Sequence, residues 1–357
     1  MALTRLPALV DVHVHVREPG ATHKEDWDSA TAAALAGGIS SILAMPNTQP
    51  AITDEASLVA TQQAAAAKAR CDYAHYLGGS VDNAQCGAAL AGRVAGLKLY
   101  LDQTYGDLKL DQLSDWQRHF AHWPRHQPLA VHAEGRSLAT AILLAALHDR
   151  PVHLCHVSRQ DEIELIRAAK AKGLPVTCEV TPHHLFLCED DIPSIGAGRA
   201  EVRPRLATAT DRAALWVNLD VIDCFASDHA PHTLEEKDGA NPPPGFAGLE
   251  SILPLLLTAV SHGHLSLEDV VLRLSENPGR IFGLPAAADS YVEVDLDARY
   301  EIKAVEMHSR CGWTPFEGHP VQGRVQRVVR RGELVFEDGR VLAAPGSGHD
   351  LRKTKTN

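Results

Sequence analysis

Residues 11–20 read DVHVHVREPG, a short apolar stretch in which valines alternate with two histidines and an arginine. Successive side chains of a strand point to opposite faces, so His13, His15 and Arg17 would share one face. Imidazoles are frequent metal ligands, and the planar guanidinium of arginine matches a carboxylate with two parallel hydrogen bonds. Three polar groups buried on one face need partners. The stretch therefore predicts a metal site with an arginine beside it.

More residues of the metal-ligand type follow the other apolar runs, in a chain whose 357 residues include 20 histidines. Imidazoles and carboxylates suit zinc, which at catalytic sites keeps one position open for water. Lys98 does not fit as a bare ammonium, because metal cations would repel it. The carbamate formed by adding carbon dioxide to its amine would be an anion able to bridge two metals. The residues at the expected strand ends are Asn47, Lys98, His132, Cys155, His156, Glu179 and Asp228.

Each of these residues also has an ordinary structural interpretation. A single histidine on an apolar strand is most often a core residue whose hydrogen bonds are satisfied. By the same reasoning, Cys155 would be a small buried apolar residue and Asp228 a helix N-cap. This interpretation is weak for His13 and His15 together, because both would be buried on one face with no other evident partner. The histidines to which we apply it are His75, His122, His148 and His153.

The elements that must position these residues are apolar runs of β type that alternate with helical stretches. Such alternation is typical of a parallel sheet buried on both faces. Eight units in about 250 residues predict an α/β fold, a (β/α)8 TIM barrel, whose active site lies at the carboxyl ends of the strands. A doubly wound open sheet is less favoured, because no glycine-rich phosphate loop follows the first strand. The expected strands are 8–16, 39–45, 72–77, 96–101, 128–133, 152–157, 176–181 and 221–228, and the expected helices are 24–36, 54–69, 110–122, 134–148, 159–172 and 210–218.

The last third of the chain changes character. Residues 290–297, 299–303 and 323–342 show β-type alternation with tight-turn sequences such as EDGR. We therefore predict three parts: a metal-dependent catalytic barrel over 8–285, a small β-rich subdomain made of 1–7 and 286–345, and a linker-like tail over 346–357. The proline-rich loop 239–248 is longer than a plain connection, as functional loops at barrel mouths often are.

Composition excludes several classes of function. The formal net charge is −11, so no broad basic surface is available for nucleic acid. No apolar run reaches the length of a membrane span. The seven cysteines are scattered, odd in number and lack CxxC spacing, which favours reduced thiols over a disulfide framework. We expect a cytoplasmic protein that binds neither nucleic acid nor a membrane.

Taken together, a series of motifs resembles dihydroorotase of the amidohydrolase superfamily over nearly the whole chain. The resemblance includes the dihydroorotase domain of the animal multifunctional pyrimidine-synthesis polypeptide, which also carries carbamoyl-phosphate synthetase and aspartate transcarbamoylase. H-x-H alone is a signal of the superfamily, whereas H-x-H-x-R-E-P-G together with S-D-H-A-P-H is far more specific. The motifs are DVHVHVREPG, AMPNT, GLKLYL, VHAE, HVSR, CEVTPHHL, EVRPRL, FASDHAPHTLEEK and NPGRIFGL.

The resemblance implies reversible ring closure of N-carbamoyl-L-aspartate to L-dihydroorotate, a step of de novo pyrimidine biosynthesis. It implies two zinc ions bridged by carbamylated Lys98 and a hydroxide, with Asp228 carrying the proton as base and then as acid. It further implies a third zinc. The ligands carried over are His13, His15, Lys98 and Asp228 for the first zinc, Lys98, His132 and His156 for the second, and Cys155, Glu179 and His13 for the third.

The resemblance also implies how the substrate is bound. Arg17, Asn47 and His232 would hold its free carboxylate, and Arg203 and the backbone of Pro244 would contact the rest. The sequence DQTYGD resembles a mobile loop that closes on the substrate through Thr104 and Tyr105, the latter where animal members carry phenylalanine. The family further suggests a homodimer and, for this chain, a possible origin within a longer multifunctional protein.

Two other functions stay open. The first is another cyclic amidase of the hydantoinase or allantoinase type, which shares the barrel, H-x-H and the lysine. Arg17 favours an acidic substrate over these, since burying an unpaired guanidinium destabilises a protein. The second is an inactive dihydroorotase-like scaffold, which the complete ligand set disfavours. One difficulty concerns Cys155 and His156, because adjacent residues of a regular strand face opposite ways. Both can be ligands only if the strand end is irregular.

Overall fold

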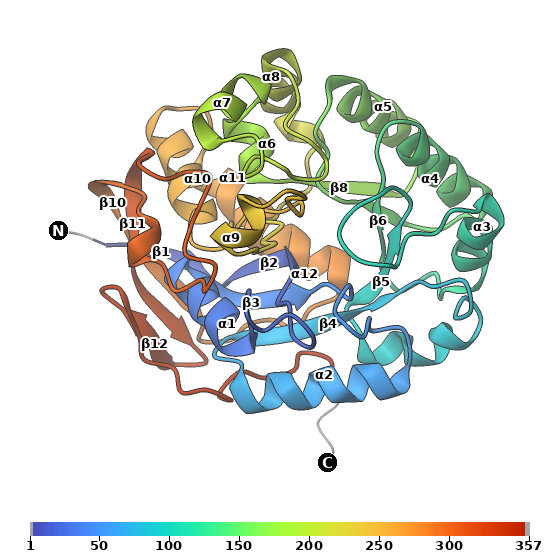
Figure 1. Ribbon diagram of the computed structural model, residues 1–357, viewed down its shortest axis with the longest axis horizontal. Coiled ribbons are helices and arrows are strands. Elements are labelled where there is room, and N and C mark those ends of the chain that lie inside the picture. The colour runs from blue at the N-terminus through green and yellow to red at the C-terminus, as the bar shows by residue number, and fades with distance from the viewer. Residues whose placement is uncertain (1–2, 354–357) are drawn as a thin grey trace.

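The computed structural model describes residues 3–353, in which eight parallel strands follow one another in chain order around a barrel (Figure 1). The last strand lies beside the first, because Val14 and His229 form a parallel bridge and the amide of His15 donates to the carbonyl of His229 at 2.7 Å. The predicted barrel is confirmed, and all eight expected strands are present. They are β2 (Leu9–Val14), β3 (Ile39–Ala44), β4 (Asp72–Gly78), β5 (Gly96–Tyr100), β6 (Leu129–His132), β7 (Val152–Leu154), β8 (Val176–Val180) and β9 (Cys224–Phe225).

Helices surround the barrel, and several begin at side-chain caps that the sequence supplies. Asp26, Asp54 and Thr208 each accept a hydrogen bond from the backbone three residues on, which fixes the starts of α1, α2 and α8. The six predicted helices correspond to α1 (Trp27–Ala36), α2 (Glu55–Lys68), α3 (Leu113–His122), α4 (Arg136–Leu147), α5 (Gln160–Ala171) and α8 (Ala209–Val217).

The remaining helical segments are short, apart from α10, which is apolar on nearly every side and packs against the second sheet. They are α6 (Pro182–Phe186), α7 (Ile192–Ile195), α9 (Leu234–Lys237), α10 (Ile252–Ser261), α11 (Leu267–Val271) and α12 (Asn277–Phe282), with 3-10 turns η1 (Cys86–Arg93), η2 (Glu189–Asp191), η3 (Leu219–Val221) and η5 (Ala304–Glu306), and a π-helical turn η4 (Leu272–Glu276). Within residues 3–353, no helix has the length and apolar character needed to cross a membrane.

A second sheet of five antiparallel strands joins the first residues of the chain to its last third, at the left of Figure 1. Its strand order is β1-β10-β11-β12-β13, so the N-terminal strand pairs with β10. This arrangement agrees with the β-rich character expected there, while the division of the chain into separate units at residue 285 stays a prediction. The strands are β1 (Thr4–Pro7), β10 (Tyr291–Glu301), β11 (Pro320–Arg330), β12 (Glu333–Glu337) and β13 (Arg340–Val341).

The expectation of a linker-like tail from residue 346 needs correction for residues 346–353. These residues run alongside β4, where the amide of Tyr73 donates to the carbonyl of His349 at 2.9 Å and the amide of Leu351 donates to that of Tyr73 at 2.8 Å. Their carbonyls also serve two arginines of β11 and the turn after it, since Ser347 accepts from Arg330 and Arg331 at 3.0 and 3.1 Å. Residues 354–357 of that expected tail lie outside the described residues.

Most buried apolar residues form a layer between the sheet and the helices, and a smaller cluster fills the barrel. His153 lies in the core with both ring nitrogens bonded, as expected. His75 is also fully buried, but its ring lies among Trp27 and Tyr73 and neither nitrogen has a partner in the described part of the chain. The core assignment is wrong for His122, which is exposed at the end of α3, and for His148, which is half-buried after α4.

Candidate active site

The expected metal ligands come together at the carboxyl ends of the barrel strands. His13 and His15 extend from β2, and both direct Nε2 at the same carboxylate oxygen of Asp228, at 3.2 and 3.1 Å from Oδ1. Ligand atoms of these three buried residues all lie within 4.8 Å of one another. Burial lowers the pKa of His13 and, more strongly, that of His15. Both imidazoles are therefore neutral at physiological pH, the form that binds a metal.

Lys98 lies on β5 with its side chain fully buried. Its Nζ is 2.9 Å from Sγ of Cys155, and among residues 3–353 no carboxylate lies within ion-pair distance of it. A buried ammonium without an anion strongly destabilises a fold. Conversion to an anionic carbamate would remove the buried cation and place two oxygens beside the imidazoles, so the surroundings of Lys98 fit the modified residue.

His132 at the end of β6 and His156 after β7 lie with Nδ1 and Nε2, respectively, 2.8 Å apart. Their other ring nitrogens, Nε2 of His132 and Nδ1 of His156, are buried and have no hydrogen-bond partner within the described residues. Burial lowers the pKa of both rings well below the usual value. Neutral imidazoles with unbonded nitrogens in a buried site have the donor character that zinc requires.

The adjacent residues Cys155 and His156 both face the site, because the strand ends before them. β7 ends at Leu154, and His156 has a left-handed backbone with φ of 35°. The turn lets Cys155 reach Lys98 while His156 reaches His132. The irregular strand end that the sequence requires is therefore present. Arg17 and Asp228 have φ of 66° and 46°, so a residue with left-handed backbone conformation also follows β2 and β9.

A second group of possible ligands shares His13. Its Nδ1 is in close contact with Glu179, while ligand atoms of His13, Cys155 and Glu179 lie within 4.8 Å of one another. The other oxygen of Glu179 is 3.1 Å from Nε2 of His153, which also contacts Thr177. Thiol, imidazole and carboxylate together form a donor set that suits zinc.

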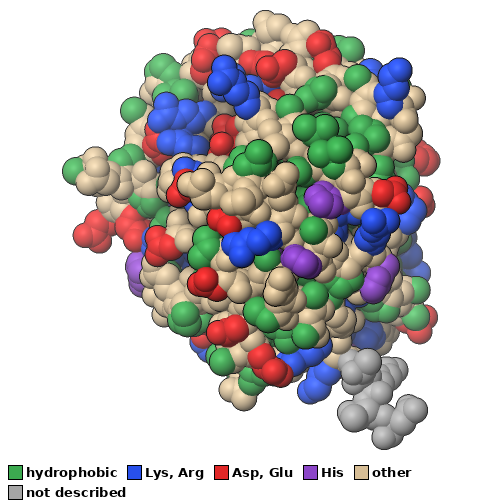
Figure 2. All heavy atoms as spheres, turned by 90° about the vertical axis from the view of Figure 1, so that its right-hand side faces the viewer, with side chains coloured by type: hydrophobic (Ala, Val, Ile, Leu, Met, Phe, Trp, Pro, Cys, Tyr) green, Lys and Arg blue, Asp and Glu red, His purple; other side chains and the backbone are tan. Residues whose placement is uncertain are grey.

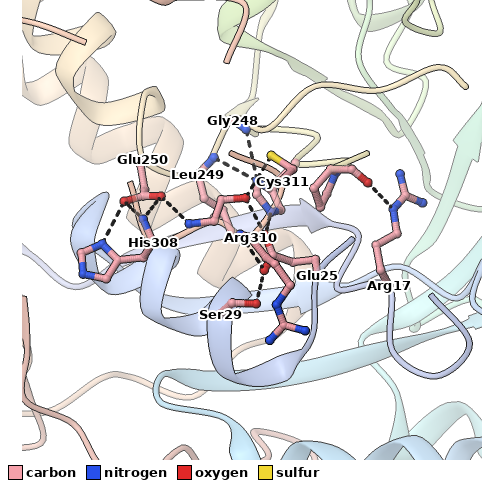
Figure 3. Close-up of polar contacts among 12 residues, drawn as sticks. Arg17, Glu25, Ser29, Gly248, Leu249, Glu250, His308, Arg310 and Cys311 are labelled. Carbon is pink, nitrogen blue, oxygen red and sulfur yellow. Dashed lines mark hydrogen bonds and ion pairs between the residues drawn. The ribbon is translucent and has the colours of Figure 1, made fainter. Parts of the chain in front are cut away.

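Arg17 lies beside these ligands with its side chain buried. Its Nε donates to the carbonyl of Pro231 at 3.1 Å, a contact visible in Figure 3, and its third nitrogen NH2 is 3.0 Å from Nε2 of His232. The remaining nitrogen, NH1, is buried and has no partner in residues 3–353. A guanidinium with one donor group unused is prepared to bind an anion.

A small cavity joins Arg17 to the metal-ligand cluster and collects the other predicted substrate residues. Its volume is about 20 Å³, the room of a single water, because the loop after β5 lies across the mouth. Tyr105 of that loop packs its ring 4.7 Å from the Arg17 guanidinium and 4.9 Å from His232. The lining residues are His15, Arg17, Asn47, Thr104, Tyr105, Val202, Arg203, Asp228, Ala230, Pro244 and Gly245.

Asn47 and His232 are each bonded within the protein as well as lying at the cavity. Oδ1 of Asn47 is 2.6 Å from Nδ1 of His15, and its Nδ2 donates to the carbonyl of Tyr105 at 3.0 Å. Asn47 thereby orients His15, one of the predicted metal ligands, and also binds the loop after β5 that covers the cavity. Nε2 of His232 is 3.0 Å from the carbonyl of Pro244. The arrangement supports an orienting function for both residues and leaves their substrate contacts as predictions.

Sequence reasoning missed Lys24, whose buried ammonium lies against His232 and Tyr105, two residues that also contact Arg17. Its Nζ is 3.0 Å from Nδ1 of His232, 3.3 Å from the hydroxyl of Tyr105 and 3.0 Å from Oε1 of Glu236. The charged run HKED over 23–26 resembles a solvated turn. The signal that could have identified it is position, since residues directly after the first strand of a barrel lie at its mouth.

A second missed feature anchors the mouth to the segment before β11, as Figure 3 shows. Glu25 is fully buried and accepts from Oγ of Ser309 at 2.5 Å and from the amide of Arg310 at 3.2 Å. Nearby, the Nδ1 of His229 accepts from the amide of Gly248 at 3.2 Å. His229, the residue that follows Asp228, is therefore held on two sides, since its Nε2 also lies 3.4 Å from Oε2 of Glu25.

Comparison with known proteins relates the sequence to enzymes of one kind. A family model described as dihydro-orotase-like matches residues 4–97. The chain is 57% identical over 98% of its length to the multifunctional protein CAD of Squalus acanthias, of which it spans 16%. It is 33% identical over 98% of its length to a dihydroorotase of Pyrococcus furiosus, of which it covers 86%.

Two solved structures are similar to the whole described fold. An L-hydantoinase from Arthrobacter aurescens superimposes with a TM-score of 0.92 at 26% identity, covering 98% of this chain and 89% of that one. An inactive dihydroorotase-like domain of a Chaetomium thermophilum CAD-like multifunctional protein gives a TM-score of 0.84 at 32% identity, covering 98% and 100%. The same barrel therefore occurs in active and in inactive proteins, and among the active ones it occurs with different cyclic amide substrates.

Proposed function

This chain belongs to the dihydroorotase family, and on that premise we propose that it catalyses the zinc-dependent, reversible cyclisation of N-carbamoyl-L-aspartate to L-dihydroorotate. The observation that carries the proposal is Arg17, buried beside the metal-type ligands with NH1 unbonded within the described residues. Both N-carbamoyl-L-aspartate and L-dihydroorotate have a free carboxylate that a guanidinium can bind. A hydantoin or allantoin ring lacks that carboxylate and would leave Arg17 unpaired.

The proposed zinc ligands divide into overlapping sets. When bound, zinc would polarise the ring carbonyl as a Lewis acid and lower the pKa of the attacking water. The donor chemistry of the buried imidazoles, and the isolation of the Lys98 amine from any carboxylate in residues 3–353, support a carbamylated Lys98. The sets are His13, His15, carbamylated Lys98 and Asp228 for the first ion, Lys98, His132 and His156 for the second, and His13, Cys155 and Glu179 for a third.

Asp228 has the position to move the proton. Its Oδ1 contacts the imidazoles of His13 and His15, so we assign the transferred proton to Oδ2. In ring opening, the water oxygen bonds to the ring carbonyl carbon and Asp228 accepts the proton that the water loses. The carbon–nitrogen bond then breaks, and Asp228 gives the proton to the departing nitrogen. Ring closure reverses these steps and releases water.

The substrate-binding residues act from the other side of the cavity. Arg17 and His232 hold the carboxylate, Asn47 orients His15 beside it, and Arg203 with the carbonyl of Pro244 bounds the ring. The loop carrying Thr104 and Tyr105 must move to admit a substrate, because the closed cavity of about 20 Å³ is too small for a six-membered ring. Closure would then exclude bulk water from the reaction.

The test is an assay of the purified protein on L-dihydroorotate, hydantoin and allantoin, together with its zinc content. We expect turnover of dihydroorotate far above that of hydantoin or allantoin, and at least two zinc ions per chain. Turnover of hydantoin or allantoin in preference would favour the other cyclic amidases, whose structural similarity is high. Loss of all three activities with fewer than two zinc ions would favour an inactive domain like the one from Chaetomium thermophilum.

The proposal includes a homodimer formed through α4 and α5. Leu143 and Leu147 lie one helical turn apart on α4 and are 56% and 67% exposed, and Leu165 on α5 is 39% exposed. Figure 2 shows hydrophobic side chains gathered on the side of the molecule that carries these helices. Adjacent exposed leucines favour association. Light scattering should give twice the chain mass for the wild type and the single mass for Leu143→Glu/Leu147→Glu.

The cellular context is also part of the proposal. The chain spans 16% of the length of the Squalus acanthias and Dictyostelium discoideum multifunctional relatives. We place it in a cytoplasmic multifunctional polypeptide that also carries carbamoyl-phosphate synthetase and aspartate transcarbamoylase. An antibody against the barrel should detect a polypeptide several times larger than 38.5 kDa in the cytosolic fraction of the source cells. A band at 38.5 kDa would overturn that assignment.

A further inference from the structure

Lys237 ends α9 with its side chain fully buried, yet it takes no part in the chemistry proposed above. Its ammonium donates to three backbone carbonyls, those of Glu201 at 2.7 Å, Pro243 at 2.9 Å and Gly245 at 3.3 Å. Three hydrogens therefore meet three acceptors. Among residues 3–353 it has no carboxylate within ion-pair distance.

The three carbonyls bracket the wall of the substrate cavity. Pro243 and Gly245 flank Pro244, and Glu201 directly precedes Val202. The two segments also bond to each other, since the amide of Gly245 donates to the carbonyl of Glu201 at 3.0 Å. Lys237 thus lies behind the wall and joins the segment that carries Arg203 to the proline-rich loop.

The backbone of the cavity wall must adopt one particular conformation around Pro244. Gly245 has φ of 146°, and a side chain there would come within 2.4 Å of the Ala230 carbonyl. The carbonyl of Pro244 must face inward to contact Nε2 of His232 at 3.0 Å. The orientation of Pro244 is therefore set by its two neighbours, whose carbonyls both bond to Lys237.

Burying the charged side chain of Lys237 makes the folded state less stable than burying an apolar side chain of the same size would. Without a carboxylate its charge is stabilised only by carbonyl dipoles and by the rings of Phe246 and Trp313, at 5.6 and 5.4 Å. An apolar side chain would fill the same volume without burying a charge. The presence of lysine at this position therefore indicates that its three hydrogen-bond donors are required, and not merely its volume.

We propose that Lys237 is a positioning residue for substrate binding, whose ammonium holds the Arg203 segment and the Pro244 loop in the spacing that the substrate requires. This inference rests on the proposed function. It assigns Lys237 no contact with substrate or with the reacting atoms, so its loss should weaken binding and leave the chemical step largely unchanged.

The protonation of Lys237 supplies a signature that a purely structural residue would lack. Burial lowers the pKa of Lys237 to about 7. The charged groups that influence it are Glu201, which favours the ammonium, and Arg17 and Arg203, which oppose it, while His232 lies near as a neutral ring. As pH rises through this pKa, the amine keeps two hydrogens for three carbonyls. The KM for L-dihydroorotate should therefore rise above neutral pH.

The experiment compares KM and kcat for L-dihydroorotate across pH 6 to 9 in the wild type, Lys237→Met and Lys237→Arg, with the exposed Lys172→Met as control. For Lys237→Met we expect KM at pH 6.5 to rise about tenfold with kcat within about threefold, since buried carbonyls lose their donors. The rise of KM with pH should disappear. Lys237→Arg, whose charge does not titrate in this range, should also give a pH-independent KM. Lys172→Met should match the wild type.

An unchanged KM in Lys237→Met, or the same pH dependence in both variants as in the wild type, would overturn the inference. If Lys237→Met does not fold, Lys237→Arg decides alone, since a flat profile supports the proposal and a wild-type profile contradicts it. Absence of dihydroorotate turnover in the wild type would instead overturn the proposed function, and this inference with it.

Discussion

At the scale of single residues, the proposed mechanism depends on the carboxylate of Asp228, which would serve both as a metal ligand and as the proton carrier. Asp228→Asn keeps the shape of the side chain but can neither accept a proton nor supply a full negative charge. We expect kcat to fall by about 10³ or more, the size of effect that a lost general base has. Steady-state assays on dihydroorotate measure it, and an unchanged circular dichroism spectrum shows that the barrel is folded. A variant within a few-fold of wild-type kcat would contradict the proposed mechanism.

Arg17 should act on affinity and specificity. Arg17→Met removes the guanidinium, so we expect KM for dihydroorotate to rise by about 10² or more. Arg17→Lys keeps the charge without the planar fork, and its KM should recover only in part. The weak turnover of hydantoin should be the same in Arg17→Met as in the wild type, because hydantoin has no carboxylate for Arg17 to bind. If both substrates lose activity equally, Arg17 supports the site as a whole instead of selecting the carboxylate.

The sequence identified most residues of this cluster, because ligand types at strand ends must converge in a barrel. It could not identify Lys24 and Lys237. Charged residues within polar loop sequences such as HKED and TLEEK are usually solvated, and nothing in a local pattern distinguishes a buried ammonium from an exposed one. Only the path of the covering segments, which is set by distant contacts, buries them.

At the scale of elements, the apolar runs of β type and the helical stretches between them predicted all eight barrel strands and six of the outer helices. The helix α10 was not predicted, because it is buried on nearly all sides and so lacks the polar face that defines an amphipathic pattern. The left-handed residue His156, which lets Cys155 and His156 face one centre, also has no local sequence signal. Its conformation is imposed by the packing around the end of β7.

The layer between β4 and α1 supplies a prediction about acid stability. His75 is fully buried and burial lowers its pKa to about 3, whereas the unfolded chain takes up a proton near pH 6.5. As pH falls below 6.5 the unfolded state gains a proton that the folded state does not, so stability is lost. Between pH 7.5 and 5, His75→Phe should lose about 2 kcal/mol less free energy of unfolding than the wild type.

Urea unfolding at the two pH values measures this difference, with the exposed His122→Phe as the matched control. The control should lose as much stability on acidification as the wild type. Equal losses in His75→Phe and the wild type would mean that His75 is protonated in the folded protein.

At the scale of the whole molecule, the second sheet is joined to the amino end of the barrel through Asp72. This carboxylate pairs closely with Arg331 and accepts from the amide of His349 at 2.9 Å. Asp72 is 8% exposed and its carboxylate lies 3.8 Å from the guanidinium of Arg330, which is 1% exposed, so Asp72→Ala should destabilise the protein by about 3 kcal/mol by leaving that buried cation without its anion. Thermal and urea unfolding test this, and activity should persist, because Asp72 lies at the end of β4 opposite the active site.

Asp220→Ala is the matched control for that substitution. It removes an ion pair with Arg167 in which the two side chains are 66% and 45% exposed. Exposed pairs contribute little, so its effect on unfolding should be much smaller. Equal effects of the two variants would show that Asp72 does not join the sheets.

The overall architecture was predictable because its parts are local: a repeated strand and helix, followed by a run of hairpin-like strands. The pairing of β1 with β10 across most of the chain agrees with the expectation that residues 1–7 join the β-rich segment, although no pattern within residues 1–7 indicated a strand. The placement of residues 346–353 did not, because their polar sequence carries no periodicity and their partners are backbone groups of β4.

The left-handed backbone at Arg17, His156 and Asp228 has an evolutionary consequence. Each such residue makes the fold less stable by about 1 kcal/mol, and glycine at the same position would relieve the strain. A single substitution can therefore remove a functional group and relax the barrel together. Where turnover is not selected for, we therefore expect substitutions at these three positions to be tolerated without loss of the barrel.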